Sequence, residues 1–326
     1  MSYTRTSSQL WSERWRLAAL PPDALLRLGL ASVLVGLLYL LFHLQGNTTD
    51  IRMFGRSAIL WMVSYWHDDL SYSWLIPFIS AGVIWYQRKS IAAAPQRTNR
   101  WGLALVVLAL LVHWMGAKAQ QVRVSLFALV LLLWGMPLYL YGWQVMKHLV
   151  FPVSFLFFCI PLNFLDELTA PLSLLATTAS THLLNGLGIA VQQVGTRMTV
   201  MDGPDMVRWT LEVAAPCSGL RSILALTILS AVYSYFTQKT LVRKWILFLA
   251  SIPLAIVGNV MRIITISLMA QAFGQDVAVG LYHDYSGFIF FPVSLGLLIG
   301  LGSLMNHHPR EIWLRWKNEL LSPISS

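Results

Sequence analysis

VRVSLFALVLLLWGMPLYLYG, residues 122–142, is an apolar stretch whose single charge is Arg123. As an α-helix it would be about 32 Å long, which matches the roughly 30 Å hydrocarbon core of a bilayer. This stretch therefore predicts a helix that crosses a membrane rather than the core of a water-soluble domain.

Comparable stretches recur along most of the chain. Of the 326 residues, 56% are hydrophobic and 11% are charged, whereas soluble proteins carry about 25% charged residues. No internal repeat or linker is visible, so we expect an all-α polytopic membrane protein with one domain over residues 1–326. About eight transmembrane segments are expected, at 25–44, 74–87, 102–117, 122–142, 145–165, 218–237, 245–262 and 288–305.

The distribution of positive charge predicts the orientation. The first apolar stretch has no small-residue cleavage site after it, which favours a first span over a signal peptide. Fifteen of the 23 Lys and Arg residues fall on one side of the expected topology, and the positive-inside rule assigns that side to the cytoplasm. Both the N-terminal segment, 1–24, and the basic tail, 306–326, are therefore expected there. The net charge of +9 is explained by these orientation signals, so we expect no nucleic-acid partner.

The stretch 166–216 does not fit a simple span. Its apolar part, 168–190, is diluted by Thr, Ser, His and Asn, which favours a re-entrant or interfacial helix. Residues 191–215 are then typical of strands. Within them MTVMDGPDMVRWTLEV alternates in polarity around Gly203–Pro204, which predicts a short β-hairpin on the outer surface.

Cys217 lies in APCSGLRS, directly after this hairpin and directly before an apolar helix. The free N–H groups and dipole at a helix N-terminus favour a thiolate over a thiol. Ser218 and Gly219 leave room for another backbone to approach, and Arg221 follows on the same helical face. The alternative reading is a buried apolar cysteine, which is our interpretation of Cys159 in FLFFCIP.

Two further charged motifs fall at ends of expected spans. Arg262 in GNVMRI would lie near the outer interface, where Asn259 could orient it one turn earlier. His283 in LYHDYSG, with Asp284 beside it, precedes the last span on the same side. For Arg262 the alternative is snorkelling to the headgroups, and for His283 it is a lone histidine on the outer face without a catalytic role.

Cys217, Arg262 and His283 share one depth and one side of the expected topology, and together they fit acyl transfer. A thiolate can attack a peptide carbonyl, a histidine can protonate the leaving amine, and an arginine can stabilise the oxyanion. Hydrolysis of the thioester would make a protease, and attack by an amine would make a transpeptidase.

Other interpretations carry less weight. His67–Asp68–Asp69 could bind a divalent metal, although an acidic loop is the simpler reading, and we expect no metal or cofactor. The competing function is a non-proteolytic membrane component of polysaccharide polymerisation or export, which would predict charges within several spans and broken, repeated helices.

The chain resembles the exosortases of the exosortase/archaeosortase superfamily, which are membrane cysteine transpeptidases. The resemblance covers roughly residues 28–305 and rests on the ordered motifs APCSGLRS, GNVMRI and YHDYSG. DLSYSWLIP at 69–77 and FPVSFLFFCIP at 151–161 are also similar to family segments.

This resemblance implies that Cys217 is the nucleophile, Arg262 the oxyanion-binding residue and His283 the acid–base. It also implies the partners: secreted proteins whose C-terminal sorting signal is a Pro-containing motif, a hydrophobic helix and a basic cluster, together with an acceptor nucleophile in the envelope. The active site would then lie on the outer face of the plasma (inner) membrane.

The chain departs from the family pattern in two places. Tyr72-Ser73-Trp74-Leu75 stands where many relatives have Tyr-Ser-His-Gly, so no histidine is available there. An acidic residue expected just before the cysteine is replaced by Ala215–Pro216, and the nearest carboxylate is Glu212. These differences suggest a divergent branch with its own sorting motif.

Overall fold

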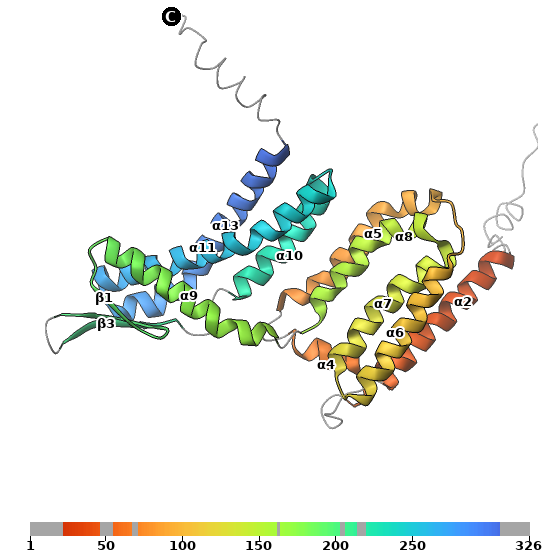
Figure 1. Ribbon diagram of the computed structural model, residues 1–326, viewed down its shortest axis with the longest axis horizontal. Coiled ribbons are helices and arrows are strands. Elements are labelled where there is room, and N and C mark those ends of the chain that lie inside the picture. Colours follow the sequence, from red (N-terminus) through yellow and green to blue (C-terminus); the bar gives the residue numbers. More distant parts are fainter. Residues whose placement is uncertain are drawn as a thin grey trace, which may run out of the picture. The chain divides into compact units, whose positions relative to one another are not determined.

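A computed structural model describes residues 22–45, 55–66, 71–161, 164–202, 206–213 and 220–306 (Figure 1). The chain divides into two compact units, Met1–Pro161 and Leu162–Ser326. The expectation of one domain over the whole chain stays a prediction.

The first unit is helical throughout the part that the structure describes. Its α-helices are α2 (Pro22–Tyr39), α4 (Ala58–Ser64), α5 (Leu75–Ala93), α6 (Arg100–Lys118), α7 (Val122–Tyr141) and α8 (Trp143–Phe155). Short π or 3₁₀ turns, η1 (Leu40–Leu44), η2 (Ser71–Trp74) and η3 (Leu156–Cys159), extend three of these helices. α6 and α7 pack closely at Gly102, where an added Cβ would overlap the backbone of Tyr139.

Two segments of the first unit that are far apart in the sequence pack together around Cys159. The indole Nε1 of Trp66 donates to the carbonyl of Cys159 at 3.0 Å, and the hydroxyl of Ser73 donates to the carbonyl of Phe158 at 3.3 Å. Trp66 and Trp74 meet edge to face. Cys159 itself is only 4% exposed, as expected for a cysteine that packs in a core.

The second unit combines helices with a small sheet. Its elements are α9 (Phe164–Gly186), β1 (Val191–Val194), β2 (Arg197–Met201), β3 (Val207–Glu212), α10 (Leu220–Thr237), α11 (Leu241–Phe273), α12 (Gln275–Val277), η5 (Ala278–Tyr282) and α13 (His283–Asn306). The strands form one antiparallel sheet in the order β1-β2-β3.

The predicted hairpin is present as β2 and β3, and β1, which lies within the stretch 191–215 predicted as strands, pairs with β2 as a third strand. β1 and β2 are joined through Gly195, which has a positive φ of 61°; glycine supplies this conformation without steric cost in two-residue hairpin turns. The expected turn at Gly203–Pro204 includes residues outside those that the structure describes.

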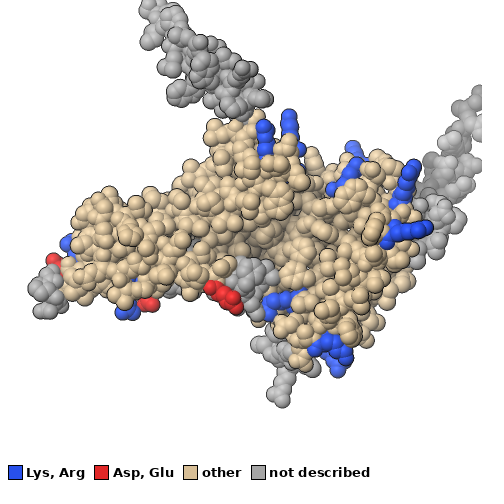
Figure 2. Space-filling model, viewed as in Figure 1, with Lys and Arg blue, Asp and Glu red and all other residues tan. Residues whose placement is uncertain are grey.

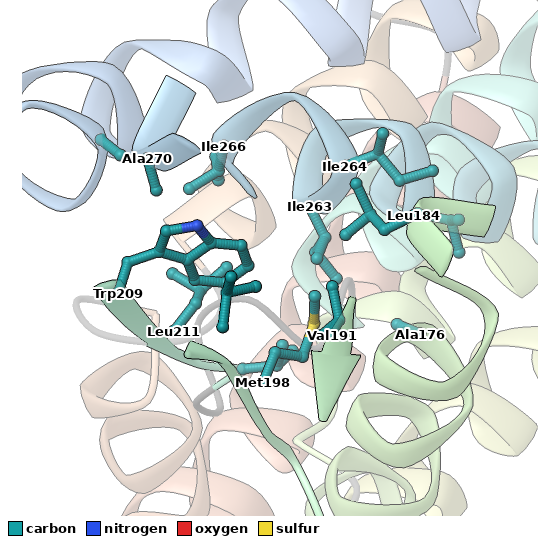
Figure 3. Close-up of a cluster of buried hydrophobic side chains, with 14 residues drawn as sticks. Ala176, Leu184, Val191, Met198, Trp209, Leu211, Ile263, Ile264, Ile266 and Ala270 are labelled. Carbon is teal, nitrogen blue, oxygen red and sulfur yellow. The ribbon is translucent and has the colours of Figure 1, made fainter. Parts of the chain in front are cut away.

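One face of the sheet packs against α9 and α11 (Figure 3). Met198 and Val200 of β2 and Trp209 and Leu211 of β3 are buried at alternate positions, as a half-buried sheet requires. Trp209 is fully buried, and its Nε1 donates to Oε1 of Gln271 in α11 at 2.8 Å. The sheet is therefore fixed to the C-terminal half of α11.

Five helices within the described residues are long and apolar enough to cross a membrane, and the expected number of about eight is not confirmed. The five are Arg100–Lys118, Val122–Tyr141, Leu220–Thr237, Leu241–Phe273 and Tyr285–Asn306, with two shorter apolar helices at Ser32–Leu44 and Trp143–Cys159. α5 forms at the expected place but carries Gln87, Arg88 and Lys89 in its second half, and these lower its hydropathy. α9 is not among the five.

Most of the surface visible in Figure 2 is neither basic nor acidic. Basic side chains appear near the α10–α11 connection, whose sequence contains Lys239, Arg243 and Lys244. Membrane proteins keep such charges at helix ends because a charge within the hydrocarbon core is costly.

Candidate active site

Arg262 lies two-thirds of the way along α11. This helix has 33 residues, so it is about 50 Å long and exceeds the thickness of the hydrocarbon core. From Leu241 to Arg262 the rise is roughly 31 Å. A helix that enters the bilayer near Leu241 therefore brings Arg262 to the opposite interface, and the remaining turns carry the sheet.

The guanidinium of Arg262 is held by α13. Its Nε donates to Oγ of Ser286 at 2.7 Å, and Ser286 is fully buried. A hydrogen bond from a charged donor is short and directional. Because the guanidinium group is planar and rigid, this bond restricts the positions that the terminal Nη groups can take.

His283 is the first residue of α13, and its side chain lies outside the described residues. Residues three apart on a helix share a face, so His283 and Ser286 belong to the same face of α13. The turn that begins with His283 is therefore the turn that contacts Arg262. Asp284 is in this turn too, and its side chain is likewise not described.

Below Arg262, α10, α11 and α13 leave a small open pocket of about 20 Å³, which has room for one water molecule. Ser222, Arg262 and Gly287 contribute to it near the starts of α10 and α13, and Leu226, Ala255 and Ser294 contribute deeper along the same helices. Asn259, which is 5% exposed, lines the wall between these levels. The pocket therefore runs from the candidate arginine into the apolar core of the unit.

The remaining candidates lie where α10 begins. Cys217, Ser218 and Gly219 fall outside the described residues, and α10 starts at Leu220. Arg221 is exposed and does not line the pocket, whereas the next residue, Ser222, does. Among the candidates whose side chains are described, Arg262 and Asn259 thus line one pocket, and Arg221 does not.

Ser286 is the contact that reasoning from the sequence missed. It stands in the YHDYSG motif, three residues after His283. A helical spacing of three from a candidate histidine could have suggested it, but serine is common at helix starts and carries no distinctive signal. No group of three or more His, Cys, Asp or Glu that could hold a metal occurs among the described residues; His67–Asp68–Asp69 falls outside them.

The sequence model of one family matches this chain. The family is described as transmembrane exosortase (Exosortase_EpsH), and the match spans residues 61–300. It includes the positions of all three candidate motifs and well over half of the chain. Comparison with curated proteins and with solved structures gave no match.

Proposed function

Because this chain belongs to the transmembrane exosortase family, a family of membrane proteases and transpeptidases, we propose that it is a cysteine endopeptidase/transpeptidase. Its substrates are exported proteins that end in a Pro-containing motif, a hydrophobic helix and a basic cluster. The enzyme cuts at the motif on the outer face of the plasma (inner) membrane, with both of its own termini in the cytoplasm.

The observation that best supports this proposal is the Arg262–Ser286 hydrogen bond. It joins α11, about two-thirds of the way along the helix, to the helix turn that begins with His283, so two of the three candidate motifs meet. Cys217 precedes Leu220 by three residues, and three residues of fully extended chain span at most roughly 11 Å. α10 contributes Ser222 to the pocket that Arg262 also lines. These contacts support the proposal that the three motifs form one site.

In the proposed reaction, the thiolate of Cys217 attacks the carbonyl carbon of the scissile bond. The C–N bond breaks, His283 gives a proton to the leaving amine, and a thioester remains on Cys217. An acceptor nucleophile or water, deprotonated by His283, then attacks the thioester and releases the thiolate. Arg262 faces the negative charge that develops on the carbonyl oxygen in both steps.

Ser286 acts in this scheme as a positioning residue, and Ser286→Ala is expected to lower kcat roughly 10- to 100-fold, because hydrogen bonds to charged groups contribute about 1.5–3 kcal/mol. KM should change little, since the oxyanion exists only in the transition state. Ser286→Thr keeps the hydroxyl and should recover part of the rate. Ser267→Ala removes an equally buried hydroxyl from α11, which among the described residues donates to the carbonyl of Ile263 in its own helix, and it should leave kcat unchanged. An equal loss in both alanine variants would contradict the positioning role.

Co-expression with a protein that carries a C-terminal sorting signal, encoded by the same genome, tests the function directly. The expected result is a shortened substrate whose new C-terminus, measured by mass spectrometry, identifies the cut. A free carboxylate indicates hydrolysis, and an added mass identifies the acceptor. If no such protein is shortened by the wild-type enzyme, the proposed function is wrong.

A further inference from the structure

Two glutamines attach the strand that precedes Cys217 to the end of α11. In β3, the indole Nε1 of Trp209 donates to Oε1 of Gln271 at 2.8 Å, and the backbone N–H of Thr210 donates to Oε1 of Gln275 at 3.0 Å. Trp209 is fully buried, whereas Gln275 is exposed. A buried donor that loses its acceptor stays unsatisfied, whereas water can replace an exposed acceptor. The contact with Gln271 is therefore the one that holds β3 most firmly.

From this attachment β3 leads toward Cys217. Its pairing with β2 reaches Glu212, and the N–H of the next residue, Val213, donates to the carbonyl of Thr196 at 2.9 Å. Val213 is buried, so the chain is held in place up to this residue. Cys217 follows it by four residues, and four residues of fully extended chain span at most roughly 14 Å. The position of β3 therefore limits where Cys217 can lie.

The helix that follows Cys217 is attached to α11 as well. The hydroxyl groups of Thr227 in α10 and Ser251 in α11 are hydrogen-bonded at 3.1 Å. The hydroxyl of Ser230 in α10 donates to the carbonyl of Leu247 in α11 at 2.9 Å. The segment that contains Cys217 therefore begins and ends at elements that are fastened to one helix.

Arg262 lies on that helix between the two attachments. Gln271 follows Arg262 by nine residues, which is about 14 Å along the helix axis. The proline inside α11 is Pro253, so the turns between Arg262 and Gln271 lack the usual cause of a kink. α11 therefore sets a constant spacing between the proposed oxyanion donor and the residue that holds β3.

We propose that Gln271 is a positioning residue, which acts through Trp209 and β3 to place Cys217 at the correct distance from Arg262. This inference rests on the proposed function. Loss of the hydrogen bond lets β3 shift on α11, and the thiolate then moves relative to the oxyanion donor. A displacement of this kind slows the chemical step, because reacting groups must be aligned to within a fraction of an ångström to 1 Å. Substrate binding is affected much less, since Gln271 lies on the far side of β3's attachment from the reacting atoms.

Gln271→Leu tests the positioning role in the full-length enzyme in membranes, with the sorting-signal protein that wild-type enzyme shortens as the substrate. Leucine has a similar size but cannot accept from the indole, so kcat should fall roughly tenfold while KM stays within about twofold. Gln271→Glu keeps an acceptor and should recover most of the rate. Trp209→Phe removes the donor instead, and its loss should not add to that of Gln271→Leu. The matched control is Gln275→Ala, which removes the exposed contact to the same strand and should behave as wild type.

The Arg262→Gln background separates positioning from a general loss of structure. If Gln271 serves to place Cys217 against Arg262, Gln271→Leu should cost roughly tenfold in the wild-type background and almost nothing in Arg262→Gln. A folding defect would instead reduce the rate by the same factor in both. Equal losses in the two backgrounds, or an unchanged kcat in Gln271→Leu, would overturn the positioning role while the processing activity stands. Absence of any processing by wild-type enzyme would overturn the proposed function and this inference with it.

Discussion

Cys217→Ala is expected to abolish processing of the sorting signal, with a loss of about 10⁴-fold or more in kcat. Without the sulfur no thioester can form, and the reaction loses its covalent intermediate altogether. The measurement is the fraction of substrate shortened on a gel over time, with wild-type and variant enzyme at equal abundance. Cys217→Ser tests the same point with a much weaker nucleophile and should also be inactive. Processing at the wild-type rate by either variant would show that Cys217 is not the nucleophile.

Cys159 is the matched control, because the chain has two cysteines. Cys159 is 4% exposed and its Sγ lies 4.0 Å from the carbonyl oxygen of Ser73. Cys159→Ala should therefore retain activity and leave Cys217 as the single thiol. On intact cells, a membrane-impermeant maleimide should label Cys159→Ala and fail to label Cys217→Ala. Labelling that appears only after the membrane is opened would contradict the outer-face location.

The helices could be predicted from the sequence where hydropathy was the dominant signal. Residues 102–117 and 122–142 are apolar over almost their whole length, which predicts helices, and α6 and α7 form there. α5 was harder, because its apolar half predicts a span while Gln87, Arg88 and Lys89 reduce the hydropathy of the whole helix. Strands were predicted over 191–215, but the bounds and pairing of β1 were not, because VQQV carries little alternation and is defined mainly by its pairing with β2.

The candidate site was only partly accessible to the same reasoning. Arg262 could be identified because a charge near the end of an apolar helix is energetically costly, which indicates a functional role. Ser286 could not, because its importance comes from a contact between helices that are distant in sequence. The same holds for the pocket. Gly258 and Gly287 look alike in the sequence, and only the packing of α13 distinguishes a close contact from an open space.

Arg262→Gln is expected to lower kcat by about 10²- to 10³-fold, the usual effect of losing one donor to a developing oxyanion. Arg262→Lys keeps the charge but loses the planar fork that Ser286 orients, so it should recover only part of the rate. The matched control is Arg208→Gln in β3, where the guanidinium donates to the carbonyl of Gln271 at 3.1 Å and does not line the pocket. Maleimide labelling of Cys217 should be unchanged in all three variants, which would show that they fold. Wild-type kcat in a labelled Arg262→Gln enzyme would remove Arg262 from the mechanism.

A double-mutant cycle decides whether Ser286 acts through Arg262. If the hydroxyl serves only to orient the guanidinium, Ser286→Ala should cost roughly 10- to 100-fold in the wild-type background and almost nothing in Arg262→Gln. If Ser286 instead supports α13 in general, the two losses should multiply. Because the hydrogen bond joins α11 to the turn that begins with His283, coupling between these residues would link the oxyanion donor to the helix that carries the acid–base. Independent losses would show that Ser286 does not act through Arg262. Another contact would then have to hold Arg262 in position relative to His283.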